Sequence, residues 1–203
     1  MRVALFAADK VGLRIAEFLG EQNEPLACLV LDGNDGQGVN AGIKQAAAVD
    51  ETQIIETIPA ERGQLAEQLS AFQPDLLVLA WWPYILKADV LAVPEIGSLN
   101  FHPSLLPHGR GKAPNFWALR NNTPFGVTIH WVNEEIDSGD IAFQRGIDVT
   151  WQDNAQTLYE RSLDTLVELF QEKWPALLAG DIPRIPQPEQ TVCHFQRELE
   201  DAS

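Results

Sequence analysis

The chain has 203 residues, a length that fits one large domain or one domain with an appendage. Hydrophobic residues make up 45% and charged residues 21%, values typical of globular proteins that fold without disulfides or metals. The net charge is −15, with 29 acidic against 14 basic residues. An acidic surface repels phosphate backbones, so this balance argues against general nucleic-acid binding.

The longest apolar run, Leu76–Trp82, is much shorter than a membrane-spanning helix. The apolar start of the chain, Met1–Phe6, is followed at once by the charged residues Asp9 and Lys10. This pattern predicts a buried first strand rather than a signal peptide. We therefore expect no association with a membrane.

The chain has two cysteines, Cys28 and Cys193, and they match neither a disulfide framework nor a zinc ligand set. This usage predicts a cytoplasmic protein without a metal. Cys28 lies in the apolar run Leu26–Leu31, where we expect it to be a small core residue rather than a reactive thiol.

In the first half of the chain, short apolar runs alternate with helical patterns, which indicates a parallel sheet with crossover helices. Leu76–Ala80, for example, is typical of a strand buried on both faces. The strands are predicted at Val3–Ala7, Leu26–Leu31, Ile54–Ile55, Leu76–Ala80 and Ile96–Phe101, and the helices at Leu13–Leu19, Ala41–Val49 and Leu65–Phe72.

The second half begins with a strand predicted at Val127–Val132, then an acidic loop, Asn133–Asp140, and a further strand at Ile141–Val149. Apolar spacing predicts a long amphipathic helix over Thr157–Leu178, broken or bent near Pro175. From residue 181 the chain contains prolines and little pattern, so we expect an extended strap or a frayed end. We predict one catalytic domain over residues 1–180, followed by a proline-containing tail over residues 181–203.

Asn100 and His102 lie at the carboxyl end of a predicted strand, where ligands bind in open α/β sheets. Two residues apart, they project from the same face. An amide N–H can stabilise an oxyanion and an imidazole can move protons, as acyl transfer to an amine requires. Asp137 and Asp140 are candidates for a carboxylate that orients the histidine. Taken singly, each residue also fits a structural role, in backbone bonding, packing or turn capping.

The residues around this site resemble the formyltransferase family, which includes glycinamide ribonucleotide transformylase, methionyl-tRNA formyltransferase and the nucleotide-sugar N-formyltransferases. The resemblance covers roughly residues 1 to 150. It is carried by four elements in the family's order, namely Asn100–Pro107, Arg110–Pro114, Gly126–Thr128 and Asp137–Ile141. It implies a Rossmann-like open, mostly parallel sheet with helices on both faces.

The resemblance also implies an enzyme that uses N10-formyltetrahydrofolate as a co-substrate and needs no metal. Asn100 takes the oxyanion-stabilising role, His102 the acid/base role and Asp137 the carboxylate role, ahead of Asp140. In relatives the pterin lies between two loops. The corresponding cofactor-binding residues here are Trp82, Tyr84, Ile85 and Leu86, and Asn133, Glu134, Glu135 and Ile136. Trp82 fits the core equally well.

Three residues are candidates for acceptor binding: Ser104, Arg110 and Lys112. A solvated basic loop is the simpler alternative for the last two. The loop Ala7–Gly12 has one glycine and an acidic residue, so it predicts a poor cradle for the phosphate of glycinamide ribonucleotide.

Methionyl-tRNA formyltransferases carry a C-terminal barrel domain, for which we expect this chain to be too short, and its negative charge also disfavours tRNA. We therefore expect a small amine acceptor, foremost an amino sugar on a nucleotide. A formyl-folate hydrolase and an inactive folate-binding protein remain alternatives, and the oligomeric state stays open, with a homodimer as one expectation.

Overall fold

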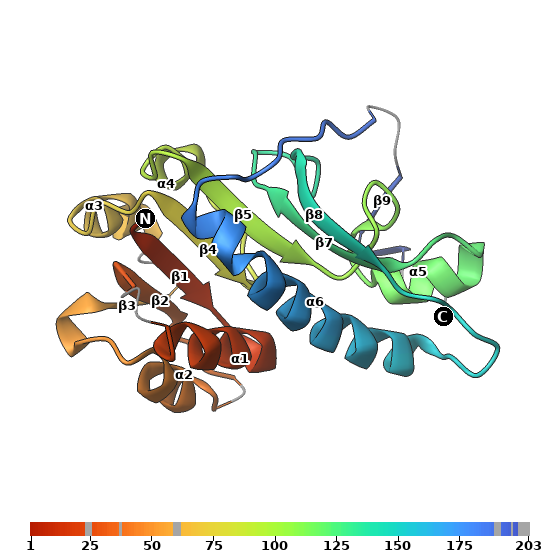
Figure 1. Ribbon diagram of the computed structural model, residues 1–203, viewed down its shortest axis with the longest axis horizontal. Helices are drawn as coiled ribbons and strands as arrows, with labels where there is room; N and C mark the ends of the chain where they lie inside the picture. The colour runs from red at the N-terminus through yellow and green to blue at the C-terminus, as the bar shows by residue number, and fades with distance from the viewer. Residues whose placement is uncertain (23–25, 37, 59–61, 189–191, 196, 199–203) are drawn as a thin grey trace. The chain divides into compact units, whose positions relative to one another are not determined.

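The computed structural model describes residues 1–22, 26–36, 38–58, 62–188, 192–195 and 197–198. The chain divides into two compact units, Met1–Asn100 and Phe101–Ser203 (Figure 1). The strand that carries the predicted catalytic asparagine and histidine crosses the boundary between them.

The first unit is built on parallel strands. They are β1 (Val3–Ala7), β2 (Cys28–Asp32), β3 (Ile54–Thr57), β4 (Leu76–Ala80) and the start of β5 (Gly97–His102), hydrogen-bonded in the order β3-β2-β1-β4-β5. Every residue of β1 and β4 is buried, as expected for central strands covered on both faces. The predicted strands of this half are therefore confirmed. Cys28 is fully buried, which raises the pKa of its thiol to about 12 and confirms it as a core residue.

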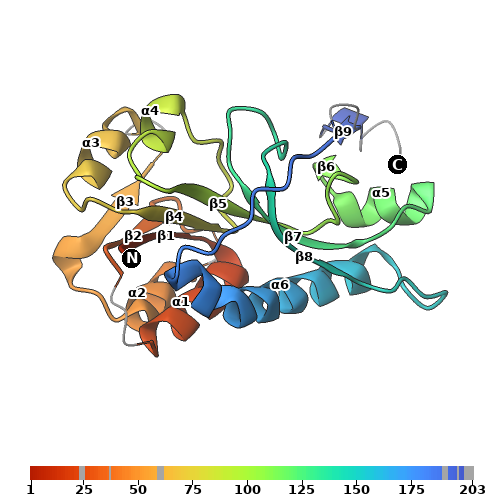
Figure 2. The same cartoon turned by 45° about the horizontal axis from the view of Figure 1, so that its top comes forward.

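The helices of the first unit are α1 (Asp9–Gly20), α2 (Asn40–Ala47), α3 (Leu65–Ser70) and α4 (Ala88–Leu91), with short 3₁₀ turns at Glu51–Gln53 and Arg62–Gln64. Figure 2 shows α1 and α2 on one side of the strands and α3 and α4 on the other. The buried residues of α1 recur at helical spacing, among them Val11, Ile15 and Leu19. The short α4 was not predicted, because a single turn carries no periodic pattern.

The second unit contains the end of β5 and an antiparallel pair, β7 (Gly126–Trp131) and β8 (Ile141–Gly146). Hydrogen bonding gives one seven-stranded, mostly parallel sheet of order β3-β2-β1-β4-β5-β7-β8, which confirms the predicted fold class. A separate two-stranded parallel ladder pairs β6 (Arg110–Gly111) with β9 (Cys193–His194), and neither strand was predicted.

The described residues of this unit form the helices α5 (Pro114–Asn121) and α6 (Ala155–Leu178), and α6 packs on β7 and β8. Asn154 caps α6 by accepting backbone N–H groups. A break near Pro175 was the wrong prediction, because the helix continues to Leu178. Pro175 lies in the last turns, and the buried side chains of Trp174 and Leu177 hold this end of the helix in place.

The segment after α6 is extended. The backbones of Ile185 and Ile141 exchange two hydrogen bonds of 2.8 and 3.0 Å, and the indole N–H of Trp131 donates to the carbonyl of Pro183 at 2.8 Å. This part of the tail therefore forms the strap, one of the two predicted alternatives. No helix in the described part of the chain is long and apolar enough to cross a membrane.

Candidate active site

The predicted catalytic histidine ends a buried strand. Asn100 and His102 lie on β5 two residues apart, so they face the same side of the strand. Asn100 is half-buried and His102 is 5% exposed. Asp137 lies in the loop between β7 and β8, far from His102 in the sequence.

The structure brings His102 and Asp137 together. Nδ1 of His102 is 3.4 Å from Oδ2 of Asp137, and its Nε2 is 2.8 Å from the carbonyl oxygen of Gly109. A carbonyl can only accept a hydrogen bond, so we assign the Nε2 proton to this contact. Nδ1, which faces the carboxylate, is therefore the nitrogen that gains or loses a proton.

A second histidine completes the site. His130 on β7 is 2% exposed, and its Nε2 is 3.6 Å from Oδ1 of Asp137. Its Nδ1 donates to the carbonyl of Trp131 at 2.8 Å. The rings of His102 and His130 meet edge to face, with centroids 6.2 Å apart. The carboxylate of Asp137 thus contacts two imidazoles, each held from its other nitrogen by a backbone carbonyl.

The backbone around Asp137 holds the carboxylate in this position. Asp137 itself is in the left-handed region, with φ 49°, and the backbone N–H of Gly111 donates to its Oδ2 at 2.9 Å. Gly139 passes so close to the carbonyl of Trp131 that a Cβ would lie 1.9 Å from that oxygen. Only glycine allows this approach.

The electrostatics of the pair follow from burial and proximity. Burial lowers the pKa of His102, although the charge of Asp137 and the bond to Gly109 oppose this shift. Burial acts to raise the pKa of Asp137, but the charge of His102, the bond and charge of His130 and the N–H of Gly111 outweigh it, so this pKa is lowered. At neutral pH an ionised carboxylate therefore faces a largely neutral imidazole, which can accept a proton.

The loop after β5 is held by a buried hydroxyl. Oγ1 of Thr128 donates to the carbonyl of Ser104 at 2.7 Å and accepts the N–H of Leu106 at 3.1 Å. The side-chain amide of Gln144 donates to the carbonyl of Leu106 at 2.6 Å. These bonds fix the chain that leads from His102 to Gly109.

The predicted acceptor-binding residues are in different environments. Ser104 is 2% exposed, and its hydroxyl contacts no hydrogen-bond partner among the described residues. Arg110 is 9% exposed, and its Nε and Nη2 donate to Oε1 of Gln187 at 3.1 and 2.7 Å. Lys112 is exposed, and its backbone N–H donates to the carbonyl of His194. Of the three side chains, only that of Lys112 is well exposed.

The predicted folate residues of the first unit differ in exposure. Trp82 is buried and packs edge to face on Phe6, at 5.1 Å between ring centroids. The hydroxyl of Tyr84 donates to Asp32 at 2.6 Å, Ile85 is 70% exposed and Leu86 is buried. These contacts favour the core alternative for Trp82.

The predicted folate residues of the second unit form a tight loop. The side-chain oxygen of Asn133 accepts the backbone N–H of Glu135 and the hydroxyl of Ser138. Glu134 and Glu135 are exposed, and Ile136 is 39% exposed beside Asp137. The side chain of Asn133 therefore shapes the loop, while an apolar side chain next to the carboxylate remains accessible.

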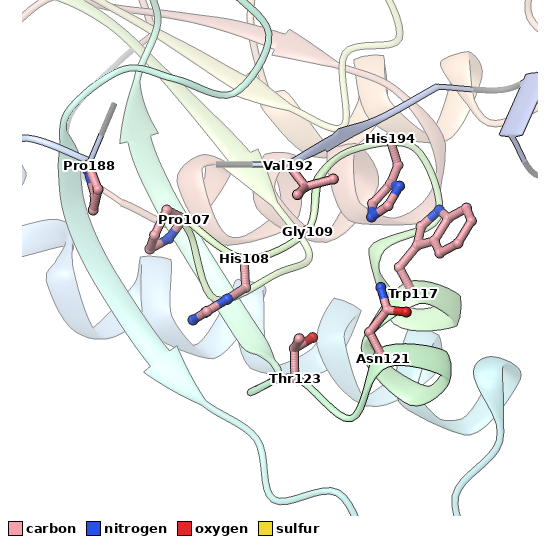
Figure 3. A pocket seen from close by; sticks show the side chains of 9 residues that line it. All are labelled: Pro107, His108, Gly109, Trp117, Asn121, Thr123, Pro188, Val192 and His194. Carbon is pink, nitrogen blue, oxygen red and sulfur yellow. The ribbon is translucent and has the colours of Figure 1, made fainter. Parts of the chain in front are cut away.

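Figure 3 shows a pocket of about 550 Å³ in the second unit. It contacts the site through Gly109, the residue whose carbonyl holds His102. Among its lining residues, the rings of Trp117 and His194 stack with centroids 4.0 Å apart. The lining residues are Pro107, His108, Gly109, Trp117, Asn121, Thr123, Pro188, Val192 and His194. Across the residues described, no group of three or more His, Cys, Asp or Glu could hold a metal ion.

Known proteins resemble the chain in sequence and fold. A methionyl-tRNA formyltransferase of Listeria monocytogenes serotype 4a (strain HCC23) is 41% identical over 134 residues, which are 66% of this chain and 43% of that protein. A formyltransferase of Anoxybacillus kamchatkensis, solved with UDP-4,6-dideoxy-4-formamido-L-AltNAc and tetrahydrofolate, has a TM-score of 0.71 at 25% identity, covering 99% of this chain and 89% of its own.

Glycinamide ribonucleotide transformylase 1 of Symbiobacterium toebii shares the fold, with a TM-score of 0.77 at 24% identity, covering 91% of this chain and 94% of its own. The chain spans about half the length of the curated relatives that it matches. The family model described as "Formyl transferase" matches residues 35–173, more than half of the chain. The predicted resemblance is thus confirmed, and the chain belongs to the formyl transferase family.

Proposed function

We propose that this protein transfers a formyl group from N10-formyltetrahydrofolate to the primary amine of a small acceptor, foremost an amino sugar carried on a nucleotide. The observation that carries the proposal is the buried contact of 3.4 Å between His102 and Asp137, at the end of the strand that bears Asn100. A pair of this kind can move a proton without exchanging it with bulk water.

The folate supplies an activated formyl group, and the residues of this chain stabilise the developing charge and move the proton. The side-chain N–H of Asn100 would donate to the formyl oxygen as negative charge develops on it. The amine nitrogen bonds to the formyl carbon, and the bond from that carbon to N10 breaks. The proton that the amine loses passes to the His102–Asp137 pair and from there to N10, so atoms and charge balance. Asp137 stabilises the imidazolium while the proton is held.

The loop residues Asn133 to Ile136 are suited to a pterin. The exposed side of Ile136 offers apolar contact to a flat ring, and the loop backbone offers polar groups to its edges. Ile85, in the first unit, is 70% exposed, and its role in folate binding stays a proposal. The Anoxybacillus relative with bound tetrahydrofolate supports a folate co-substrate.

The choice of acceptor is supported by charge. Asp9 begins α1, and its carboxylate accepts the N–H of Lys10 at 2.5 Å. This carboxylate occupies an N–H group at the start of the helix that would otherwise bind a phosphate, and it repels a second negative charge. This argues against glycinamide ribonucleotide as the acceptor. Among the three predicted acceptor residues, Lys112 is the exposed cation that can meet an acceptor phosphate, and roles for Ser104 and Arg110 there remain proposals.

A second candidate is formyl transfer to methionyl-tRNA, favoured by the 41% identity with the Listeria enzyme. The net charge of −15 argues against it, because tRNA binding depends on contacts between cations and phosphates. The cytoplasmic location and the homodimer also stay predictions.

The test is turnover of N10-formyltetrahydrofolate, followed by absorbance, with nucleotide-linked amino sugars, glycinamide ribonucleotide, methionyl-tRNA or no amine. We expect acceleration by an amino sugar, and a loss of at least about 10²-fold in His102→Ala and Asn100→Ala. Near-normal rates in His102→Ala would refute the mechanism. Release of tetrahydrofolate without an amine would indicate a hydrolase instead.

A further inference from the structure

Gln187 lies where the C-terminal strap crosses the loops of the candidate active site. Its Nε2 donates to the backbone carbonyls of Asp137 and Gly139, at 3.0 and 2.6 Å. Its Oε1 accepts Nε and Nη2 of Arg110, at 3.1 and 2.7 Å. We propose that Gln187 is a positioning residue that holds the Asp137 loop against His102, and that Arg110 acts through Gln187. The proposal rests on the proposed function, because it assigns a role at that same site.

The bonds form a closed ring around the carboxylate. Arg110 holds Gln187, Gln187 holds the carbonyl of Asp137, and the carboxylate of Asp137 accepts the N–H of Gly111, the neighbour of Arg110. The carbonyls of residues 137 and 139 lie in a loop, outside β7 and β8, and Gln187 binds both of them. Fixing two carbonyls two residues apart fixes the orientation of the peptide groups between them, and therefore the direction of the Asp137 side chain.

Glutamine is the side chain that these partners need. Its amide offers one oxygen with two lone pairs and two N–H groups, and here the oxygen takes two guanidinium donors while the nitrogen meets two carbonyls. Residues 183–186 and 188 are exposed, whereas Gln187 is half-buried. In this part of the strap, Gln187 is thus the residue whose side chain turns toward the loop.

The strap is anchored on both sides of the Asp137 loop. Pro183 binds Trp131, the last residue of β7, and Ile185 binds Ile141, the first residue of β8. Figures 1 and 2 show the segment leaving α6 and passing β7 and β8 on its way to β9. These anchors fix the backbone of Gln187 next to the Asp137 loop. Little conformational freedom is therefore lost when its side chain binds the loop carbonyls.

The first experiment compares Gln187→Leu and Gln187→Glu with Gln171→Leu, a control at an exposed position on α6. Leucine removes all four bonds, whereas glutamate keeps an acceptor for Arg110 and loses both donors to the loop. We expect kcat to fall on the order of 10²-fold in both Gln187 variants with little change in the KM of the acceptor, because a misplaced catalytic group costs about this much. The control should match the parent.

The second readout needs no acceptor. The titratable groups against His102 are Asp137 and His130, and Cys193 lies near Asp137, Arg110 and Glu198. If Asp137 moves away, the charge that raises the pKa of His102 weakens, so NMR of the imidazole should show a lower pKa for His102 in Gln187→Leu, the variant that adds no charge. Gln171→Leu should titrate as the parent does. An unchanged pKa of His102 in folded Gln187→Leu, or a kcat equal to that of the parent in folded Gln187→Glu, would overturn the proposal.

A double-mutant cycle with Arg110→Met tests the role of Arg110. If Arg110 acts through Gln187, the double variant with Gln187→Leu should be no slower than the slower single variant. Losses that multiply, with a raised KM for the acceptor from Arg110→Met alone, would overturn this part and favour direct binding of the acceptor by Arg110. Should no amine accelerate turnover, the proposed function fails, while the NMR titration still decides the positioning role.

Discussion

Replacing Asp137 with asparagine removes a charge and leaves the shape of the site almost unchanged. The amide oxygen can still accept the N–H of Gly111, which lies 2.9 Å from Oδ2 in the native protein. What is lost is the negative charge beside two imidazoles, at 3.4 Å from His102 and 3.6 Å from His130. The substitution therefore isolates the electrostatic role of the carboxylate from its role in packing.

The size of the effect follows from these distances. An opposite charge this close shifts a pKa by about 1–3 units, so losing it should lower the pKa of His102 by a similar amount. The sign is fixed, because burial already lowers this pKa and the carboxylate opposes that shift. Since acid–base catalysis contributes about 10²–10⁴-fold, we expect kcat to fall within this range.

The assay is the pH dependence of formyl transfer, measured for the native protein and Asp137→Asn. The limb that reports His102 should move to lower pH in the variant, with the maximal rate reduced. NMR titration of the imidazole provides an independent value. A variant with an unchanged pKa for His102 and a rate within about threefold of native would refute the role given to the carboxylate.

Three further substitutions test the fold around the site. Asp153→Asn should lower Tm at pH 7, because the backbone N–H of Thr150 and the side chain of Arg161 donate to the Asp153 carboxylate and its pKa is lowered to about 2. A carboxylate whose pKa is lowered in the folded protein stabilises the fold at pH values above its ordinary pKa of 3.8. The difference in Tm between the native protein and Asp153→Asn should therefore vanish as the pH falls from about 4 through 2. Phe170→Ala should cost about 3–5 kcal/mol of unfolding free energy in denaturant titrations, since the ring is fully buried. Gly139→Ala should abolish formyl transfer, because the new Cβ would displace the loop from Trp131.

Two of these substitutions have a control variant, and the third is checked by its pH dependence. Trp151→Ala, at a position 91% exposed, should change the unfolding free energy by no more than about 0.5 kcal/mol, unlike Phe170→Ala. A Cβ added at Gly146 would meet no atom within 4 Å, so Gly146→Ala should turn over at the native rate, whereas Gly139→Ala should not. A difference in Tm between native and Asp153→Asn that persists at pH 2 would contradict the linkage.

The strands were predictable because a buried strand requires apolar residues that follow one another in the sequence. Leu76–Ala80 is a continuous apolar run, and a strand covered on both faces requires one. The short elements were not predictable in the same way. The ladder of β6 and β9 joins residues more than eighty positions apart through two residues each, so neither segment carries a periodic signal.

His130 shows how a site residue escapes a sequence pattern. It lies on a strand that alternates as strands do, and a buried histidine on such a strand is most simply a packing residue. Its contact with Asp137 depends on the turn that brings this aspartate back against β7, with a glycine two residues later that permits the close approach. A histidine at a polar position of this alternating strand, shortly before an aspartate loop, is the signal that was available.

Arg110 shows the opposite case, a residue that the family resemblance identified but whose partner lies elsewhere in the chain. A basic residue in a glycine-containing loop predicts contact with an anionic acceptor when only neighbouring residues are considered. In the folded chain Arg110 is 9% exposed, and its guanidinium donates to Gln187, which is 77 positions away in the sequence. A buried guanidinium that donates to a neutral amide is stable only if the amide is fixed by hydrogen bonds of its own. Here the amide N–H groups of Gln187 donate to the two loop carbonyls. Arg110 therefore needs Gln187 as its acceptor, and Gln187 in turn needs the carbonyls of the Asp137 loop. The tail and this loop thus form one hydrogen-bonded unit.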